Sequence, residues 1–267
     1  MLLLATLLLG MSCSNNDASD AAQPQVIPFE VTAVNAVNTT RATLNSSYEL
    51  TFEAGDQLAI TGTGVSGTLT LSEGAGTGTA KFTGTLASSG TPAADLELTA
   101  TLTGSEGTQT GLATTFADAF HKYGLLTGTS TYASRTFHLQ QQSSFVLFDI
   151  KFQAGIAAGT TFDVTVSDDA NASIASSSTT TAAVGSDLKA TFALALPGGT
   201  TLTNAKMTLS PTSGTPLEFT FGGSSYTFVK NKYYTVTRTV TPNAIIVQSD
   251  IAEWTPGSGD PTGSVQF

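Results

Sequence analysis

The fold of this chain is decided in the stretch FVLFDIKF, residues 145–152. Its even-numbered residues, from Val146 to Phe152, are all apolar and lie on one face of an extended strand, whereas Phe145 and Leu147 add apolar bulk on the other face. Alternation with a period of two residues indicates a β-strand. Because both faces carry apolar side chains, we expect this strand to lie at the centre of a sheet.

Apolar residues alternate in the same way along most of the chain, with turn-forming residues between the alternating stretches at a spacing of roughly 8–12 residues. This spacing is typical of β-sandwiches, so we predict one sandwich domain at residues 26–138 and a second at residues 139–267. A hairpin turn is predicted at residues 230–232. The other stretches predicted as strands are 26–37, 48–52, 58–60, 69–71, 80–82, 96–102, 162–166, 190–196, 207–209, 217–221, 226–228, 233–240 and 244–247.

One segment of the first domain departs from this alternation. Leu112, Phe116, Phe120 and Tyr123 recur at the spacing of a helix face, and Gly124 follows as a stop signal. We therefore predict about three turns of helix, packed on the first sandwich.

The composition is that of an acidic chain with few charges. Charged residues make up 11% of the 267 residues, and 20 acidic against 10 basic side chains give a net charge of −10. The basic residues form no cluster, and binding to phosphate backbones requires clustered Lys and Arg. The composition therefore excludes nucleic acid as the expected partner.

The first residues are typical of an export signal. Residues 2–9 form an apolar run that is too short to span a bilayer but fits the core of a signal peptide. Cys13, the only cysteine, follows the small residues of Gly10-Met11-Ser12, which resembles a bacterial lipobox although Gly10 stands where Leu is usual. The resemblance implies a signal peptide at 1–12, a lipidated Cys13 and a tether at 13–25; the alternative is a signal peptide with a chance cysteine.

The stretch GTGVSG, residues 62–67, matches the glycine pattern of dinucleotide-binding loops. That pattern binds a pyrophosphate only when a helix begins directly after it, and a predicted strand follows here. We interpret it as a glycine-rich hairpin loop. His121 and His138 are the only histidines, and the G-x-S-x-G pattern of a nucleophile elbow does not occur in the sequence, so we expect no enzyme.

Asp168, Asp169 and Asn171 carry oxygen ligands of the kind that calcium binds. Their spacing is not that of an EF-hand, and we interpret them as a polar turn between two strands. No metal and no cofactor are predicted.

Several segments, taken in their order along the chain, resemble the fimbrillin-like, type V pilin-related lipoproteins of Bacteroidota. The resemblance covers nearly the whole mature chain, and the order of its segments is more specific than any one of them. It implies two transthyretin-like Greek-key β-sandwich domains. The segments that carry it are the lipobox and residues 41–43, 48–58, 116–124, 145–152, 232–236 and 251–254.

The family also implies a route of assembly at the outer membrane. A protease cuts the lipoprotein precursor after an Arg in its leader, the first strand is lost, and a strand from the next subunit replaces it. Arg41, followed by Ala42, is the matching position, and an ordinary loop Arg is the alternative. The candidate strands are a removable one with Val26, Phe29, Val31 and Val37, and a donor with Val265 and Phe267.

The expected function is that of a lipid-anchored surface protein, a structural or accessory pilus subunit that supports adhesion. Its expected partners are other fimbrial subunits, the outer membrane, and a glycan or protein on a host or bacterial surface. The alternative is a glycan-binding lipoprotein of a polysaccharide uptake system, in which Trp254 would contact the ligand. A glycan-array signal that Trp254→Ala abolishes would favour this alternative.

Overall fold

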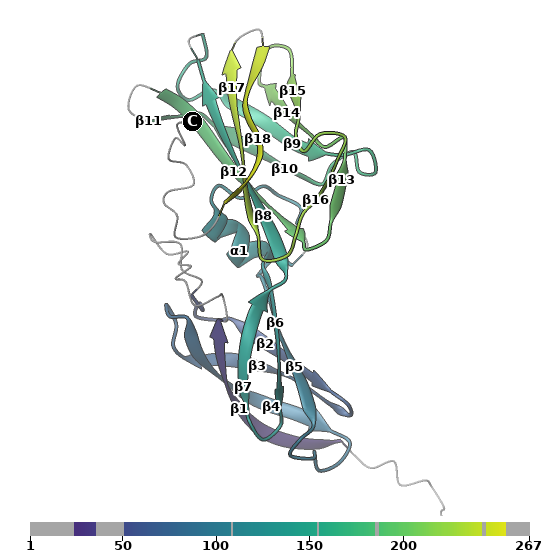
Figure 1. Ribbon diagram of the computed structural model, residues 1–267. Coiled ribbons are helices and arrows are strands. Elements are labelled where there is room, and N and C mark those ends of the chain that lie inside the picture. The colour runs from purple at the N-terminus through teal and green to yellow at the C-terminus, as the bar shows by residue number, and fades with distance from the viewer. Residues whose placement is uncertain are drawn as a thin grey trace, which may run out of the picture.

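The computed structural model describes residues 24–35, 51–107, 109–153, 155–184, 187–241 and 244–254. In these ranges the protein is mainly β, with eighteen strands and one short helix, which confirms the predicted class. Figure 1 shows the strands in two groups at opposite ends of the molecule, with the helix between them.

The first group of strands forms one closed sheet. Its strands are β1 (Gln25–Asn35), β2 (Gln57–Gly62), β3 (Val65–Glu73), β4 (Thr79–Ser88), β5 (Glu97–Thr103), β6 (Leu125–Thr131) and β7 (Thr136–Gln141). Neighbours are antiparallel in the order β1-β4-β3-β2-β5-β6-β7, and a parallel pairing of β1 with β7 closes the ring. This half is therefore a single closed sheet, because β1 pairs with β4 on one side and with β7 on the other. Its predicted description as a β-sandwich domain stays a prediction.

The glycine-rich stretch between β2 and β3 is a tight hairpin, as predicted. The two strands pair up to Gly62 and Val65, which leaves a two-residue turn. Gly64 has a φ of +70°, a left-handed conformation that glycine adopts at little cost. The chain continues directly into a strand, so the helix that a dinucleotide site requires does not follow.

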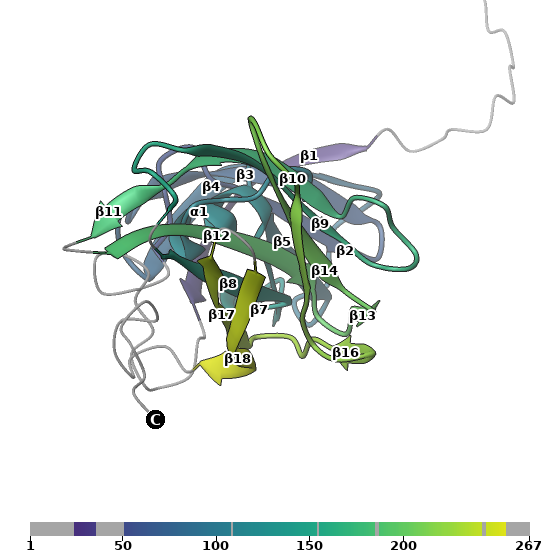
Figure 2. The ribbon, with the colours of Figure 1, turned by 90° about the horizontal axis from the view of Figure 1, so that it is seen from above.

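The second group of strands forms a sandwich of two sheets and a short ribbon. Its strands are β8 (Ser143–Phe152), β9 (Thr161–Ser167), β10 (Ala175–Thr180), β11 (Ala182–Val184), β12 (Asp187–Pro197), β13 (Thr201–Thr203), β14 (Lys206–Pro211), β15 (Leu217–Thr220), β16 (Ser225–Thr227), β17 (Tyr233–Thr241) and β18 (Ala244–Trp254). The sheet orders are β11-β12-β8-β17-β18 and β10-β9-β14-β15, and β13 pairs with β16. Viewed from above in Figure 2, these strands lie over the closed sheet.

Strand β8 is central, as its sequence predicts. It pairs with β12 on one side and with β17 on the other, and both of its faces are buried. Val146, Phe148 and Ile150 belong to the core of the sandwich, whereas Phe145 and Leu147 belong to the core that continues into the closed sheet. One strand therefore contributes to both hydrophobic cores.

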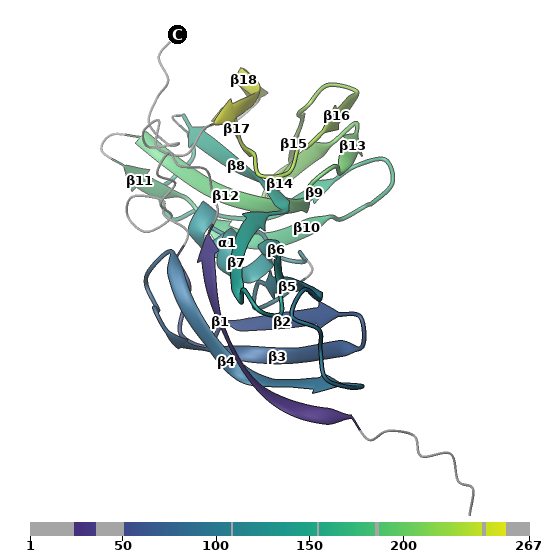
Figure 3. The same ribbon diagram turned by 60° about the horizontal axis from the view of Figure 1, so that its bottom comes forward.

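Helix α1 (Phe116–Tyr123) is shorter than predicted and begins four residues later. Thr115 caps it, because its side chain accepts a hydrogen bond from the amide of Asp118 at 3.1 Å. Leu112 lies before the helix in extended chain and joins the core of the sandwich, so its helical spacing was coincidental. The helix also packs on β8 and β12 rather than on the first sheet alone (Figure 3).

The expected hairpin at residues 230–232 is changed. Lys230 and Asn231 do form a turn, but β16 and β17 on its two sides belong to different sheets, so the turn is not a hairpin. Strand β7 belongs to the closed sheet and β8 to the sandwich, so the chain passes from one to the other at Gln142. The limits of the two domains at residues 138 and 139 stay a prediction.

The loop that follows β5 lies against the C-terminal end of α1. The amides of Gly104, Ser105 and Glu106 donate to the carbonyls of Gly124, His121 and Lys122 at 2.7, 2.8 and 2.9 Å. These bonds satisfy carbonyl groups that have no partner inside the helix.

Gly104→Ala is expected to lower the free energy of unfolding by about 1–3 kcal/mol. A Cβ at this position would lie 2.5 Å from the carbonyl carbon of Lys122 and 2.6 Å from the amide nitrogen of Tyr123, and neither main-chain atom can rotate away. The matched control is Gly90→Ala, whose Cβ would meet nothing within 4 Å. Urea unfolding followed by circular dichroism checks both variants, and equal stability of the two would contradict the prediction.

Candidate functional site

Strand β1, the candidate removable strand, is bonded unequally on its two sides. It pairs with β4 over residues 25–34, from Gln25 opposite Ser88 to Val34 opposite Thr79. On the other side it pairs with β7 only at residues 32–35. In the described chain, residues 25–31 therefore have a strand neighbour on one side only. Figure 3 shows β1 in purple, extending beyond the rest of the sheet.

The inward face of β1 is a row of apolar side chains. Phe29 is 3% exposed, Val31 2% and Ala33 0%, and all three belong to the core of the closed sheet. Val26 is 65% exposed. Side chains alternate between the two faces of a strand, and Val26 lies three residues before Phe29, so it is on the opposite face. The strand thus contributes Phe29, Val31 and Ala33 to the core, and its removal stays a prediction.

The turn between β6 and β7 clamps Phe29 from outside. The ring of Phe29 stacks on Tyr132 with centroids 5.3 Å apart, and the guanidinium carbon of Arg135 lies 4.5 Å from the centroid of Phe29. The amide of Thr32 donates to the carbonyl of Arg135 at 2.9 Å. Sequence analysis missed Tyr132 and Arg135, because they are about a hundred residues away along the chain from Phe29 and belong to no recognisable motif.

Other predicted site residues lie outside the described residues. They are the lipidation site Cys13, the cleavage site at Arg41 and Ala42, Val37 at the end of the removable strand, and Val265 and Phe267 of the donor strand. Trp254, the predicted glycan contact, is the last residue of β18 and lies opposite Tyr233 in the ladder.

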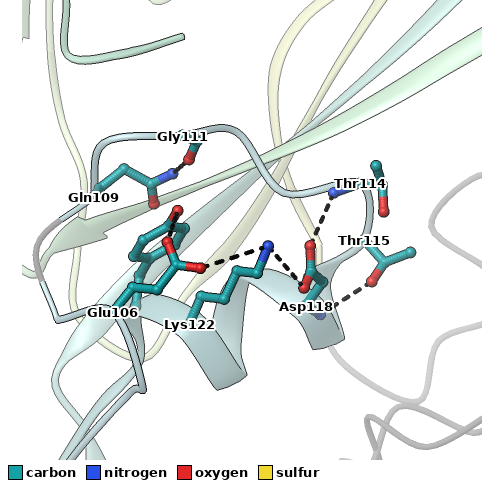
Figure 4. Close-up of polar contacts among 8 residues, drawn as sticks. Glu106, Gln109, Gly111, Thr114, Thr115, Asp118 and Lys122 are labelled. Atoms are coloured by element: carbon teal, nitrogen blue, oxygen red, sulfur yellow. Dashed lines mark hydrogen bonds and ion pairs between the residues drawn. The ribbon is translucent and has the colours of Figure 1, made fainter. Parts of the chain in front are cut away.

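Helix α1 carries a polar cluster on its exposed side (Figure 4). Lys122 lies 3.4 Å from a carboxylate oxygen of Asp118 and 3.8 Å from one of Glu106. The hydroxyl of Tyr123 donates to Glu106 at 2.8 Å, and burial is the main cause that raises the pKa of Tyr123 above its usual range. These contacts hold the chain around the helix together.

The two histidines and the acidic turn lie on different elements of the fold. His121 lies 3.8 Å from Glu53, and His138 is exposed on β7. Asp168 accepts from the amide of Asn171 at 2.8 Å in the turn between β9 and β10, as the turn interpretation predicts. In the described ranges, no group of three or more His, Cys, Asp or Glu side chains is placed to hold a metal ion. In the same ranges, no helix has the length and apolar character needed to cross a membrane.

Comparison with known proteins finds structural similarity only. No family model matches the sequence, and neither does any curated protein. A candidate cell adhesion protein from Bacteroides ovatus superposes with a TM-score of 0.52 at 11% identity, over 86% of this chain and 99% of that one. The superposition shows that these two chains share a fold.

Two further solved structures are similar at lower TM-scores. A candidate cell adhesion protein from Bacteroides uniformis gives 0.49 at 15% identity, over 85% of this chain and 99% of that one. The tip fimbrial protein Mfa3 from Porphyromonas gingivalis, truncated at its C-terminus, gives 0.41 at 10% identity, over 86% of this chain and 100% of that one.

Proposed function

We propose that this protein is a fimbrillin-like lipoprotein of the cell surface, a structural or accessory pilus subunit that assembles by β-strand addition and supports adhesion. The observation that carries the proposal is the position of β1. This strand closes the sheet of the N-terminal half, yet it is paired on both sides only over residues 32–35.

Loss of β1 would open the closed sheet and create a site for another strand. The main-chain groups of β4 that bond to β1 would lose their partners, and an unpaired strand edge is a template for addition. Removal would also expose the core beneath Phe29 and Val31. An incoming strand that buried two such side chains would gain about 1.5–3 kcal/mol from each, before the cost of ordering.

The remaining steps of the route are part of the same proposal. Cys13 would carry the lipid anchor at the outer membrane, cleavage after Arg41 would release β1, and the stretch with Val265 and Phe267 would be the donor. The fold shared with the candidate cell adhesion protein of B. ovatus supports an adhesive or fimbrial role. We also propose the transthyretin-like Greek-key path for both halves, supported in the C-terminal half by its sandwich of two sheets.

Cleavage after Arg41 is expected to convert the monomer into multimers that resist denaturing gel electrophoresis. The test digests the chain from residue 14 onward with an arginine-specific protease and confirms the cut by mass spectrometry. Arg41→Ala, digested in the same way, is the control, because Arg135 and Arg238 are still available for cutting in both proteins. A wild-type chain that is cut after Arg41 and stays monomeric would overturn the proposal.

A further inference from the structure

Residues 109–114, which we call the bridging segment, lie between the edges of the two sheets of the sandwich. The amide of Ala113 donates to the carbonyl of Ala193 on β12 at 3.0 Å, and the amide of Ala193 donates back to Ala113 at 2.7 Å. On the other side, the amide of Ser176 on β10 donates to the carbonyl of Thr110 at 3.1 Å. Gly111 forms a parallel bridge with Ser176, and Ala113 an antiparallel bridge with Ala193.

Two side chains of this segment also bind the sandwich in the way that an added strand would. The Oε1 of Gln109 accepts a hydrogen bond from the amide of Ala195 at 2.8 Å, in the place of a main-chain carbonyl. Leu112 is 7% exposed and joins the core of the sandwich, whereas its neighbour Ala113 joins the core shared with the closed sheet. Figure 4 shows Gln109 and Gly111 beside α1 in the chain that leads to this helix. Main-chain bonds combined with an anchored side chain are the features of β-strand addition.

The bridging segment covers an edge that would otherwise be open. Strand β11 pairs with β12 only at Asp187, Leu188 and Lys189, so the rest of that edge has no strand neighbour in the described chain. Amides along an antiparallel strand point alternately to its two sides, so those of Ala193 and Ala195 face away from β8. An exposed edge of this kind pairs readily with other chains.

We propose that the bridging segment is an intramolecular edge guard, which occupies the strand-addition site of the C-terminal sandwich and prevents a second copy of this chain from pairing there. The proposal concerns self-association of the uncut protein. Its consequence, that subunits add only at the N-terminal half, rests on the proposed function.

Gln109→Leu tests whether the bridging segment protects the edge of β12, because leucine leaves the amide of Ala195 without its acceptor. Amide exchange followed residue by residue by NMR should be about tenfold faster at Ala195, the effect of losing one hydrogen bond. The amide of Leu194, which points to β8, is the internal reference. Gln140→Leu, the same change at an exposed position, is the matched control and should leave exchange at Ala195 unaltered.

The doubly changed chain Gln109→Leu/Ala113→Pro tests the guard function, because proline also removes the amide that bonds to Ala193. With β1 uncut, this variant should form dimers or larger species as its concentration rises, whereas the wild type stays monomeric by light scattering. If the double variant fails to fold, the same measurement is made on Gln109→Leu. Unchanged exchange at Ala195, or faster exchange in a protein that stays monomeric, would each overturn the proposal. Neither result depends on whether cleavage at Arg41 produces multimers.

Discussion

Phe29→Ala is expected to lower the free energy of unfolding by about 3–5 kcal/mol, the usual cost of removing a buried aromatic ring. Phe29 is 3% exposed, stacks on Tyr132 and lies under the guanidinium of Arg135. The variant therefore loses the buried ring, its stacking and its cation–π contact together. Because β1 closes the sheet, the loss of packing should also weaken its pairing with β4 and β7. Urea unfolding followed by far-ultraviolet circular dichroism measures the loss.

The matched control is Val26→Ala on the same strand. Val26 is 65% exposed on the opposite face, so its truncation should alter stability by no more than about 0.5 kcal/mol. If both variants lose the same stability, β1 does not contribute to the core in the way described. Under the proposed function, Phe29→Ala should also form multimers faster than wild type after cleavage, because the strand to be released is held less tightly.

Phe145→Ala is expected to cost a similar free energy, about 3–5 kcal/mol, through a different part of the molecule. Phe145 is fully buried on the face of β8 that is turned toward α1. Its ring stacks on Tyr233 at 5.6 Å and lies 6.1 Å from the ring of Phe120 in the helix. The change should therefore loosen the contact between the sandwich and α1 as well as lower stability. Thermal unfolding gives the stability, and amide exchange along α1 reports the loosened contact.

Val229→Ala serves as the control for Phe145→Ala, because Val229 is 52% exposed in the same half of the chain. Its expected effect is within about 0.5 kcal/mol of zero. A loss at Phe145 that is confined to stability, with unaltered exchange in α1, would show that this ring does not couple the helix to the sandwich.

Local patterns in the sequence predicted much of the fold. The alternation in residues 145–152 identified a central strand with two apolar faces, and the glycines of residues 62–67 identified a hairpin. Both predictions succeeded because a strand's faces and a turn's backbone conformation are properties of neighbouring residues. The inward row of β1 follows from the same rule, and so does the outward position of Val26, which lies an odd number of residues from Phe29.

Patterns that depend on distant partners were misread. Leu112 fits the face of a helix, yet it inserts into the sandwich. Thr115 caps a helix that begins only at Phe116, and the edges of β10 and β12 bind the chain before it. The clamp of Arg135 on Phe29 also joins segments that no local rule connects.

The sequence by itself determined the mainly β class of the protein and its central strand, because periodicity and turn chemistry are encoded in adjacent residues. Only the tertiary structure decided that the N-terminal half closes into one sheet through β1 and that residues 109–114 cover the edge of the sandwich. The physical reason is that every residue except proline offers the same main-chain donor and acceptor. Which strand edge pairs with which is therefore set by the packing of side chains far apart in the chain.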